Sequence, residues 1–377
     1  MPPPLSLAFD AKRAFDNRTG LGNYARTLLT SLAEHQPDLT LGLYAPRPPR
    51  FAEAQTWAAA LARHPQVRTV VPASGGSGAL WRTFQLGPRA AQEGARLFHG
   101  LSGELPRGLP AHVKAVVTVH DLIFWRYPHL FPALDRFFYR QKLLHACRRA
   151  DAVVCISEAT RAELLDLVPG AGAELETKTT VIYQSAEARA APRFLAEPAL
   201  PGPARLLYVG ALTERKNVAT VLRALQLLPD VDFHFDILGA GPAAPALAGL
   251  IAADARLTDR VHLRGHVTDA ALAAALAQAT ALVYPSTAEG FGIPILEALL
   301  AGLPVVASNG SSLPEAGGDA ARYCPPHDPA AWAAALRAVL TNPAEREAMR
   351  AKGYAHAAQF NPARIATQWA ELYRRLA

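Results

Sequence analysis

Two carboxylates eight residues apart, Glu289 and Glu297, flank a Gly-Phe-Gly-Ile-Pro segment that has the features of a helix start. Pro294 suits the first turn of a helix, because its fixed φ angle and missing N–H cost nothing there. Backbone amides at such an end point outward from the positive end of the helix dipole, where anions bind. These amides belong to Phe291, Gly292 and Ile293. The pattern suits a ligand with a phosphate and hydroxyl groups, such as a nucleotide sugar.

A second candidate group is basic and precedes a predicted helix. Arg215 and Lys216 can neutralise a pyrophosphate, because arginine offers a planar fork of donors and lysine a point charge. A solvated basic turn explains the pair equally well when it is considered alone. The glycine-rich residues 19–24, which include Gly20 and Gly22, would let a backbone approach a phosphate closely before a helix over residues 23–33.

Several polar residues follow predicted strands, where ligands bind in open parallel sheets. His120 and Asp121 end a strand in the first half of the chain. In the second half, Gly210 follows a strand with Thr213 and Arg215 just beyond it, Gly239 and Gly241 follow another, and Ser286 and Glu289 follow a third. A lone residue of this kind is usually structural. Four polar strand ends in two domains are a stronger indication, because a cleft between the domains would collect them.

Short apolar runs alternate with longer helical patterns, which predicts βαβ units and mainly parallel sheets. The strands expected in the first half cover residues 5–9, 39–44, 67–71, 97–99, 113–120, 152–156 and 180–183. Those in the second half cover residues 205–209, 231–238, 261–264, 281–284 and 304–307. We therefore predict two successive Rossmann-like α/β domains.

The domain boundaries follow from composition. Residues 186–203 contain four prolines and many alanines and are typical of a linker. The predicted parts are a first Rossmann-like domain over residues 1–190, a linker over 191–203, a second Rossmann-like domain over 204–355, and a helix over 356–377 that crosses back to the first domain.

Composition excludes several other classes of protein. The 377 residues are 50% hydrophobic and 19% charged, as in a globular protein with two buried cores. The N-terminus lacks the basic region of a signal peptide, and no apolar run reaches the ~18 residues that span a bilayer. The three cysteines have neither metal-ligand spacing nor a disulfide framework, so we expect a cytoplasmic protein.

The net charge of +6 lies entirely in the first half of the chain. Residues 1–190 hold 22 Lys and Arg against 16 Asp and Glu, and residues 191–377 hold 16 of each. Two explanations of this asymmetry are equally good. One is compositional drift; the other is that the first domain contacts an inner membrane face or a phosphate-bearing acceptor. Basic and aromatic residues do not interleave as in nucleic-acid-binding proteins. Residues 136–149 do not form a clean amphipathic helix, because their basic and apolar positions scatter around the helix.

These motifs together resemble family-four retaining glycosyltransferases, which have the GT-B fold, and in particular their mannosyltransferase-like members. The spacing from Glu289 to Glu297 is similar to the E-x7-E motif of that family, and residues 208–217 resemble its phosphate-binding loop. Residues 98–106 and 118–122 resemble segments of the first domain in mannosyltransferase-like members. The resemblance covers nearly the whole chain, with the E-x7-E segment as its most specific part.

The resemblance implies that residues 1–190 form the acceptor domain and residues 204–355 the nucleotide-sugar donor domain. It also implies a role for each candidate residue. Lys216 with Arg215 would hold the donor diphosphate, Glu297 the ribose, and Glu289 the transferred sugar. His120 would lie near the reaction centre, and the glycines at 20 and 22 would close over the phosphates. Many members carry Arg directly after the glycine of the phosphate loop, where this chain has Ala211 and then Arg215 four residues later. The catalytic residues expected are His120, Lys216 and Glu289. The donor-binding residues expected are Gly20, Gly22, Gly210, Arg215, Lys216, Gly239, Glu289, Phe291, Gly292, Ile293 and Glu297.

The activity implied is transfer of a hexose from a nucleoside-diphosphate sugar, with retained anomeric configuration and no metal ion. GDP-mannose is the expected donor, with UDP-glucose and other donors open. A glycan or lipid-linked molecule in cell-surface polysaccharide synthesis is the expected acceptor. Two alternatives stay open at this point: a nucleotide-sugar epimerase with the same fold, and a non-catalytic nucleotide-sugar-binding protein.

Overall fold

The computed structural model describes residues 4–72, 78–170, 172–187 and 202–377. The chain divides into two compact units, which are described separately below. Unit 1 comprises residues 1–185 and 360–377, and unit 2 comprises residues 186–359. The expected linker over residues 191–203 lies outside the described residues except for its last two positions.

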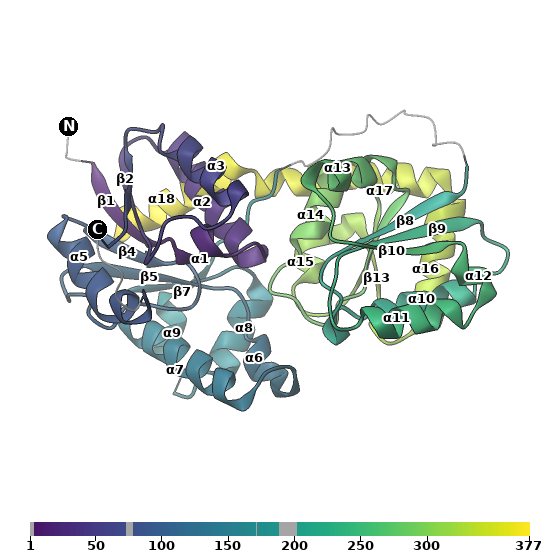
Figure 1. Cartoon of the computed structure of the whole chain (residues 1–377), viewed down its shortest axis with the longest axis horizontal. Coiled ribbons are helices and arrows are strands. Elements are labelled where there is room, and N and C mark those ends of the chain that lie inside the picture. Colours follow the sequence, from purple (N-terminus) through teal and green to yellow (C-terminus); the bar gives the residue numbers. More distant parts are fainter. Residues whose placement is uncertain (1–3, 73–77, 171, 188–201) are drawn as a thin grey trace. The chain divides into compact units, whose positions relative to one another are not determined.

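Unit 1 contains a seven-stranded parallel sheet in the order β3-β2-β1-β4-β5-β6-β7 (Figure 1). Its strands are β1 (Leu5–Asp10), β2 (Leu39–Tyr44), β3 (Val67–Val70), β4 (Leu97–Gly100), β5 (Lys114–Val119), β6 (Ala152–Cys155) and β7 (Thr179–Val181). Its helices include α1 (Lys12–Asp16), α2 (Gly20–His35), α3 (Ala52–Leu61), α5 (Leu86–Gln92), α6 (Ile123–Arg126), α7 (Ala133–Arg149), α8 (Glu158–Leu167) and α9 (Ala173–Lys178). The central strands are almost wholly buried, as expected for a parallel sheet with helices on both faces.

The last helix of the chain, α18 (Pro362–Leu376), belongs to unit 1 and packs against α2 (Figure 1). The Asn361 side chain caps its first turn by accepting a hydrogen bond from the amide of Ala363 at 2.9 Å. Trp369 and Tyr373 are fully buried, and the Tyr373 hydroxyl lies 2.8 Å from Nδ1 of His99 on β4. The predicted return of the C-terminal helix to the first domain is therefore confirmed.

Unit 2 contains a six-stranded parallel sheet in the order β10-β9-β8-β11-β12-β13. Its strands are β8 (Ala204–Val209), β9 (Phe233–Leu238), β10 (Val261–Gly265), β11 (Ala281–Tyr284), β12 (Val305–Ser308) and β13 (Ala321–Cys324). Its helices include α10 (Val218–Gln226), α11 (Ala244–Ala252), α13 (Asp269–Gln278), α14 (Ile293–Leu300), α16 (Pro329–Thr341) and α17 (Pro343–Ala357). The predicted α/β class with two parallel sheets is confirmed.

The structure differs from the sequence-based expectation at two strands of unit 2. Strand β9 begins at Phe233 instead of residue 231, because residues 229 and 230 form a turn and the chain becomes extended only after it. Strand β13 was not predicted: it is four residues long, lies at the sheet edge and contains the exposed Arg322. In the part of the chain that the structure describes, no helix is both long and apolar enough to cross a membrane.

Candidate active site

Lys216 lies at the carboxyl end of β8, in the short 3₁₀ helix Glu214–Lys216 that precedes α10. Asn217 follows with a left-handed backbone (φ 54°), and its side-chain amide donates to the carbonyl of Pro285 at 3.3 Å. This turn directs the Lys216 side chain into unit 2, where the residue is only 8% exposed. A buried ammonium group requires partners of opposite charge or strong acceptors.

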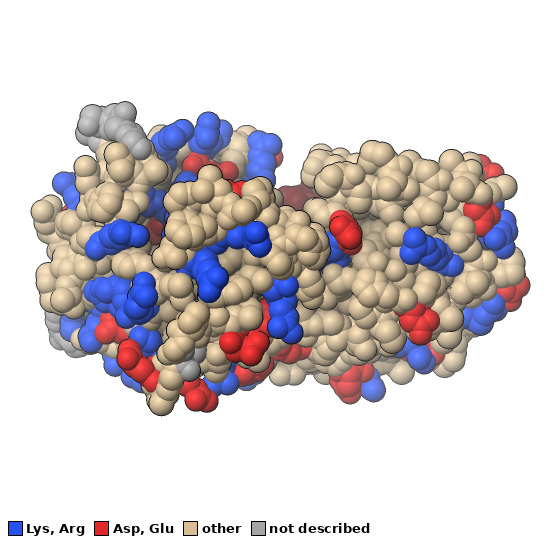
Figure 2. Space-filling view, turned by 90° about the horizontal axis from the view of Figure 1, so that it is seen from below, with Lys and Arg blue, Asp and Glu red and all other residues tan. Residues whose placement is uncertain are grey.

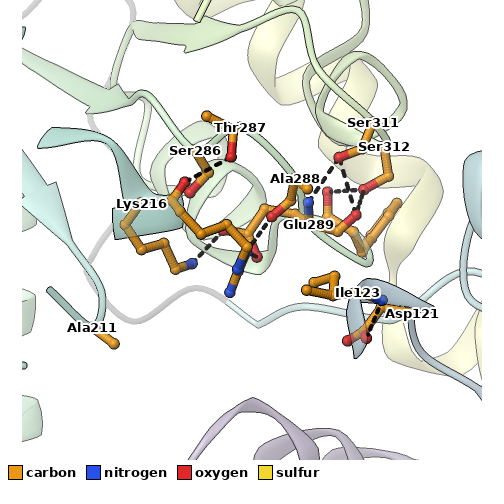
Figure 3. Close-up of polar contacts among 12 residues, drawn as sticks. Asp121, Ile123, Ala211, Lys216, Ser286, Thr287, Ala288, Glu289, Ser311 and Ser312 are labelled. Carbon is orange, nitrogen blue, oxygen red and sulfur yellow. Dashed lines mark hydrogen bonds and ion pairs between the residues drawn. The ribbon is translucent and has the colours of Figure 1, made fainter. Parts of the chain in front are cut away.

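Glu289 supplies that partner from the loop after β11 (Figure 3). One oxygen of its carboxylate accepts a hydrogen bond from Nζ of Lys216, and the other lies 3.0 Å from Nη1 of Arg215. Nη1 of Arg215 also donates to the carbonyl of Ala288. The backbone is tied in the same way, because the amide of Thr287 donates to the carbonyl of Arg215 at 2.9 Å. The two loops are therefore joined through both side-chain and backbone contacts.

The hydroxyl of Tyr284 completes this cluster. It accepts a hydrogen bond from Nζ of Lys216 at 2.9 Å and donates to Glu289 at 3.3 Å. Burial and the nearby Glu289 charge raise the pKa of Tyr284, so the phenol stays protonated and can donate. Burial disfavours the Glu289 charge, but the Lys216 and Arg215 cations outweigh that cost and hold the pKa of Glu289 below its usual value. Glu289 is therefore ionised, and two cations share one carboxylate.

The expected helix start after Glu289 is present as α14. Gly292 precedes it with φ 122°, a conformation that favours glycine, and Pro294 occupies the first turn. Among the described residues, the amides of Gly292 and Ile293 have no hydrogen-bond partner in the protein. Two serines hold the preceding loop: Ser311 accepts from the amide of Glu289 at 2.8 Å, and Ser312 donates to the carbonyl of Phe291 at 3.0 Å (Figure 3). Glu297, in the second turn of α14, is 8% exposed.

The glycines after β8 and β9 allow two loops to touch. A Cβ atom on Gly239 would lie 1.8 Å from the carbonyl oxygen of Gly210, and Gly239 has φ 141°. The Gly210 amide in turn donates to the carbonyl of Leu238 at 3.0 Å. Both glycines thus allow close packing of the loops at the carboxyl ends of β8 and β9. Ala211 is exposed, and its carbonyl accepts a hydrogen bond from the Tyr208 hydroxyl at 2.9 Å.

His120 follows β5 in unit 1 and is held in a fixed orientation. Its Nε2 lies 2.8 Å from the carbonyl of Leu101, which can only accept, so Nε2 carries the proton. The ring meets the Tyr24 ring edge to face at 4.6 Å. Burial, with a smaller contribution from the Arg13 charge, lowers the pKa of His120 to about 4 despite the opposing bond to Leu101. The imidazole is neutral at neutral pH, and its Nδ1 can accept a hydrogen bond.

The glycine-rich segment of unit 1 differs from its expected form. Gly20 and Gly22 lie in the first turn of α2, which begins at Gly20 and not at residue 23. The Asn17 side chain permits this early start by accepting from the amides of Thr19 and Gly22 at 2.7 and 3.2 Å. A Cβ atom on Gly22 would lie 1.9 Å from the Asn17 carbonyl oxygen, whereas nothing lies within 4 Å of one on Gly20. Only Gly20 therefore presents an open backbone.

The structure unites Arg215, Lys216 and Glu289 directly in unit 2, and it places His120, Gly20 and Gly22 in unit 1. Sequence reasoning missed Tyr284 and the two serines. A tyrosine that ends a strand could have been noted as a polar strand end, but serines 22 and 23 residues from Glu289 give no local indication. Among the described residues, no group of three or more His, Cys, Asp or Glu is arranged to hold a metal ion.

Comparison with known proteins shows the family of the chain. Residues 18–183 match the model of Glycosyltransferase Family 4, and residues 203–342 match that of Glycosyl transferases group 1. O-antigen chain mannosyltransferase B of Escherichia coli is 32% identical over 288 residues, which cover 74% of each chain. The chain belongs to the family-four glycosyltransferases. O-antigen chain mannosyltransferase RfbU of Salmonella typhimurium is a further relative, 27% identical over 61% of this chain and 62% of its own.

Solved structures of glycosyltransferases share the whole fold of this family-four member. Sucrose-phosphate synthase from Thermosynechococcus elongatus superposes with a TM-score of 0.73 at 23% identity over 99% of both chains. HepE from Anabaena, solved in complex with UDP, gives 0.73 at 18% identity over 99% of this chain and all of that one. The predicted GT-B fold is confirmed.

Proposed function

We propose that this glycosyltransferase moves mannose from GDP-mannose to a glycan or lipid-linked acceptor in polysaccharide synthesis. The observation that carries the proposal is the cluster of Lys216 and Arg215 around Glu289, in which two cations share one carboxylate. Ammonium and guanidinium groups suit a diphosphate, and the carboxylate suits sugar hydroxyls. The mannosyltransferase names of two relatives support mannose as the sugar.

In this proposal, Lys216 and Arg215 bind the diphosphate and stabilise the charge that develops on it as its bond to the anomeric carbon breaks. The free amides at the start of α14 add to this stabilisation. Glu289 holds the transferred sugar and Glu297 the ribose. The cations and the helix end would do the electrostatic work that a metal ion does in other transferases.

Retention is proposed to follow from attack on the face that the diphosphate leaves. The acceptor oxygen bonds to the anomeric carbon, and its proton passes to an oxygen of the departing diphosphate. His120 would contribute a neutral polar ring near the sugar, since its pKa of about 4 keeps it from exchanging protons at neutral pH. Gly20, with its open backbone at the start of α2, would approach the phosphates, and buried Gly22 would shape that turn.

A donor screen tests the proposal. The midpoint of thermal unfolding is measured with GDP-mannose, UDP-glucose, ADP-glucose and GDP, since a ligand that binds only the folded state raises this midpoint. We expect the largest rise with GDP-mannose. A rise with a UDP-sugar and none with GDP-mannose would overturn the choice of donor.

Product analysis then separates the activities. Sugar transfer is measured with an acceptor extract, with and without EDTA, and the product anomer is identified by proton NMR. We expect a retained anomer and equal rates in EDTA. An inverted anomer, or loss of activity in EDTA, contradicts the mechanism. Interconversion of the donor without an acceptor identifies an epimerase, and binding without turnover identifies a non-catalytic protein.

A further inference from the structure

A chain of hydrogen bonds crosses the core of unit 1 from α18 to α2. The hydroxyl of Tyr373 lies 2.8 Å from Nδ1 of His99, and Nε2 of the same ring lies 2.7 Å from Oγ1 of Thr118. Oγ1 of Thr118 also lies 3.1 Å from the hydroxyl of Tyr24. All four side chains are buried, and they are called the tyrosine network below.

The tyrosine network carries no full charge. Burial, with a smaller contribution from the His120 charge, lowers the pKa of His99 to about 3, so one ring nitrogen donates and the other accepts at neutral pH. Burial also raises the pKa of Tyr24 and of Tyr373, so both hydroxyls keep their protons. By contrast, charged side chains gather over unit 1, the unit at the left, on the face drawn in Figure 2. The network is therefore a neutral feature of the core and not an extension of the charged surface.

Polar groups in a core contribute little net stability, because each hydrogen bond only replaces one made with water. What such a network does supply is fixed geometry, since each hydroxyl or imidazole must point at its neighbour. Its function is therefore to be sought at its ends. One end is Tyr373 in α18, and the other is Tyr24 in the second turn of α2.

Tyr24 is the end of the network that reaches the candidate active site. Its ring meets the His120 ring edge to face, with 4.6 Å between the centroids and 86° between the planes. Thr118 and His120 lie two residues apart at the carboxyl end of β5, which is about 7 Å along a strand and places both side chains on one side. The Tyr24 side chain spans this distance, with its hydroxyl at Thr118 and its ring against His120.

The glycine-rich start of α2 makes this contact possible. A Cβ atom on Gly22 would lie 1.9 Å from the carbonyl oxygen of Asn17, so the first turn of α2 can lie this close only with glycine at that position. Tyr24 follows two residues later and is 6% exposed. Residues 19–24 thus supply a buried aromatic group in addition to the open backbone of Gly20.

We propose that Tyr24 is a positioning residue that orients the imidazole of His120. The other members of the tyrosine network hold Tyr24 in place. The Leu101 carbonyl and the Tyr24 ring restrict the imidazole from two directions, so that its Nδ1 keeps one orientation as an acceptor. The inference rests on the proposed function only for the place of His120 near the sugar, because the orientation of the ring can be measured without any substrate.

Nuclear magnetic resonance of the His120 ring tests the orientation directly. The full chain is prepared with isotope-labelled histidine, and the His120 signals are identified by their absence from His120→Asn. In the wild type we expect the tautomer that is protonated at Nε2. Tyr24→Leu should give a mixture of tautomers, whereas Tyr24→Phe, which keeps the ring, should retain most of the wild-type signal. An unchanged His120 signal in Tyr24→Leu overturns the proposal.

A double-mutant cycle then tests whether Tyr24 acts through His120. Sugar transfer is measured for Tyr24→Leu, His120→Asn and the combined variant. In Tyr24→Leu we expect kcat to fall about tenfold and the donor KM to change less than about twofold, because the ring is misplaced while the diphosphate site is intact. Tyr24→Phe should recover most of this rate. The combined variant should be no slower than His120→Asn alone, and additive losses would contradict the proposal.

Phe15→Leu is the matched control, because Phe15 is a fully buried aromatic residue of the same unit that packs against Trp57. It should lower the midpoint of thermal unfolding as Tyr24→Leu does but leave kcat and the His120 signal unchanged. An equal fall of kcat in Phe15→Leu would show that lost stability alone explains the effect, which overturns the proposal. A wild-type rate in His120→Asn refutes the place of His120 in the proposed function, and the His120 signal in Tyr24→Leu still decides whether Tyr24 orients the ring.

Discussion

The parallel sheets of the two units both end in a cluster of charged side chains, but the clusters differ in balance. In unit 1, Arg82 binds Asp10 at 2.5 Å and Glu104 at 2.6 Å, and Lys142 lies 3.4 Å from Glu104. Two cations thus meet two carboxylates through direct ion pairs. Each of these four groups has a partner within unit 1, which is the condition for a stabilising buried network.

In unit 2, by contrast, Lys216 and Arg215 share the single carboxylate of Glu289. Both cations pair with the same carboxylate, and all three side chains are nearly buried. The amides of Gly292 and Ile293 follow at the start of α14, where an anion would bind. The comparison indicates that a cluster with one carboxylate for each cation maintains the fold, whereas one in which two cations meet on a single carboxylate suits a charged substrate.

Removing the central cation of the balanced cluster should have the largest effect, and it should be on stability. Arg82→Gln leaves Asp10 and Glu104 without their main partner, which costs about 3–5 kcal/mol of unfolding free energy. Urea denaturation measures this loss, and calorimetric titration should show unchanged donor affinity. Arg126→Gln is the control, since its pair with Asp166 is solvent-exposed and should cost less than about 1 kcal/mol. A stable Arg82→Gln protein with weakened donor binding would show that the unit 1 cluster serves binding and not stability.

Breaking the unbalanced cluster should mainly affect catalysis. Lys216→Ala and Glu289→Ala should each lower the rate of sugar transfer by at least about 10² while the fold is kept, because the charge on the leaving diphosphate loses its stabilisation. Steady-state kinetics of the purified variants measure the effect. Lys352→Ala, which removes an exposed cation of unit 2, should leave the rate unchanged. Wild-type activity in Glu289→Ala would show that the site assignment is wrong.

The Tyr284 hydroxyl allows its hydrogen bonds to be separated from the ion pair between Lys216 and Glu289 in unit 2. Tyr284→Phe removes one acceptor for Lys216 and one donor for Glu289 but keeps the direct ion pair. We expect kcat/KM to fall about fivefold, the value of one net hydrogen bond. Tyr323→Phe, a change in the same unit away from this cluster, serves as the control. An unchanged kcat/KM would mean that the ion pair alone positions Lys216.

The smallest expected effect concerns His120 of unit 1, whose neutral imidazole makes the stability of the fold depend on pH. The pKa of His120 is lowered to about 4, so the unfolded chain binds a proton near pH 6.5 and the folded chain does so only near pH 4. Stability contributed by the neutral ring is therefore present above pH 6.5 and lost as the pH falls toward 4. Wild type should lose roughly 1 kcal/mol more than His120→Asn between pH 6.5 and 5.5. Urea midpoints across this range measure the difference, and parallel curves would contradict it.

Much of the fold could be predicted because its strands are short apolar runs of the kind that only a buried parallel sheet accommodates. Strands β2 and β11 have the predicted bounds. Edge strand β13 could not be found in this way, because Arg322 interrupts its apolar pattern. The start of α2 was misplaced because Asn17 caps the amides of Thr19 and Gly22 through its side chain, an interaction that glycine spacing does not reveal.

The candidate site was predictable in its residue types but not in its pairing. The spacing of Glu289 and Glu297 and the adjacent Arg215 and Lys216 indicated a phosphate-and-sugar site. Nothing local indicates that Lys216 and Glu289, 73 residues apart, would contact one another directly. That contact depends on the adjacency of β8 and β11 in the sheet, which is a property of topology and not of either motif.

The location of α18 has a consequence for the order in which the chain folds during synthesis. Trp369 and Tyr373, which fill the core of unit 1, follow the whole of unit 2 in the sequence. The whole of unit 2 must be translated before α18 can pack against α2. At ordinary elongation rates of about 5–20 residues per second, this delay lasts roughly ten seconds or more. During that time the apolar surface around His99 stays uncovered, so unit 1 is completed only after unit 2 has been translated.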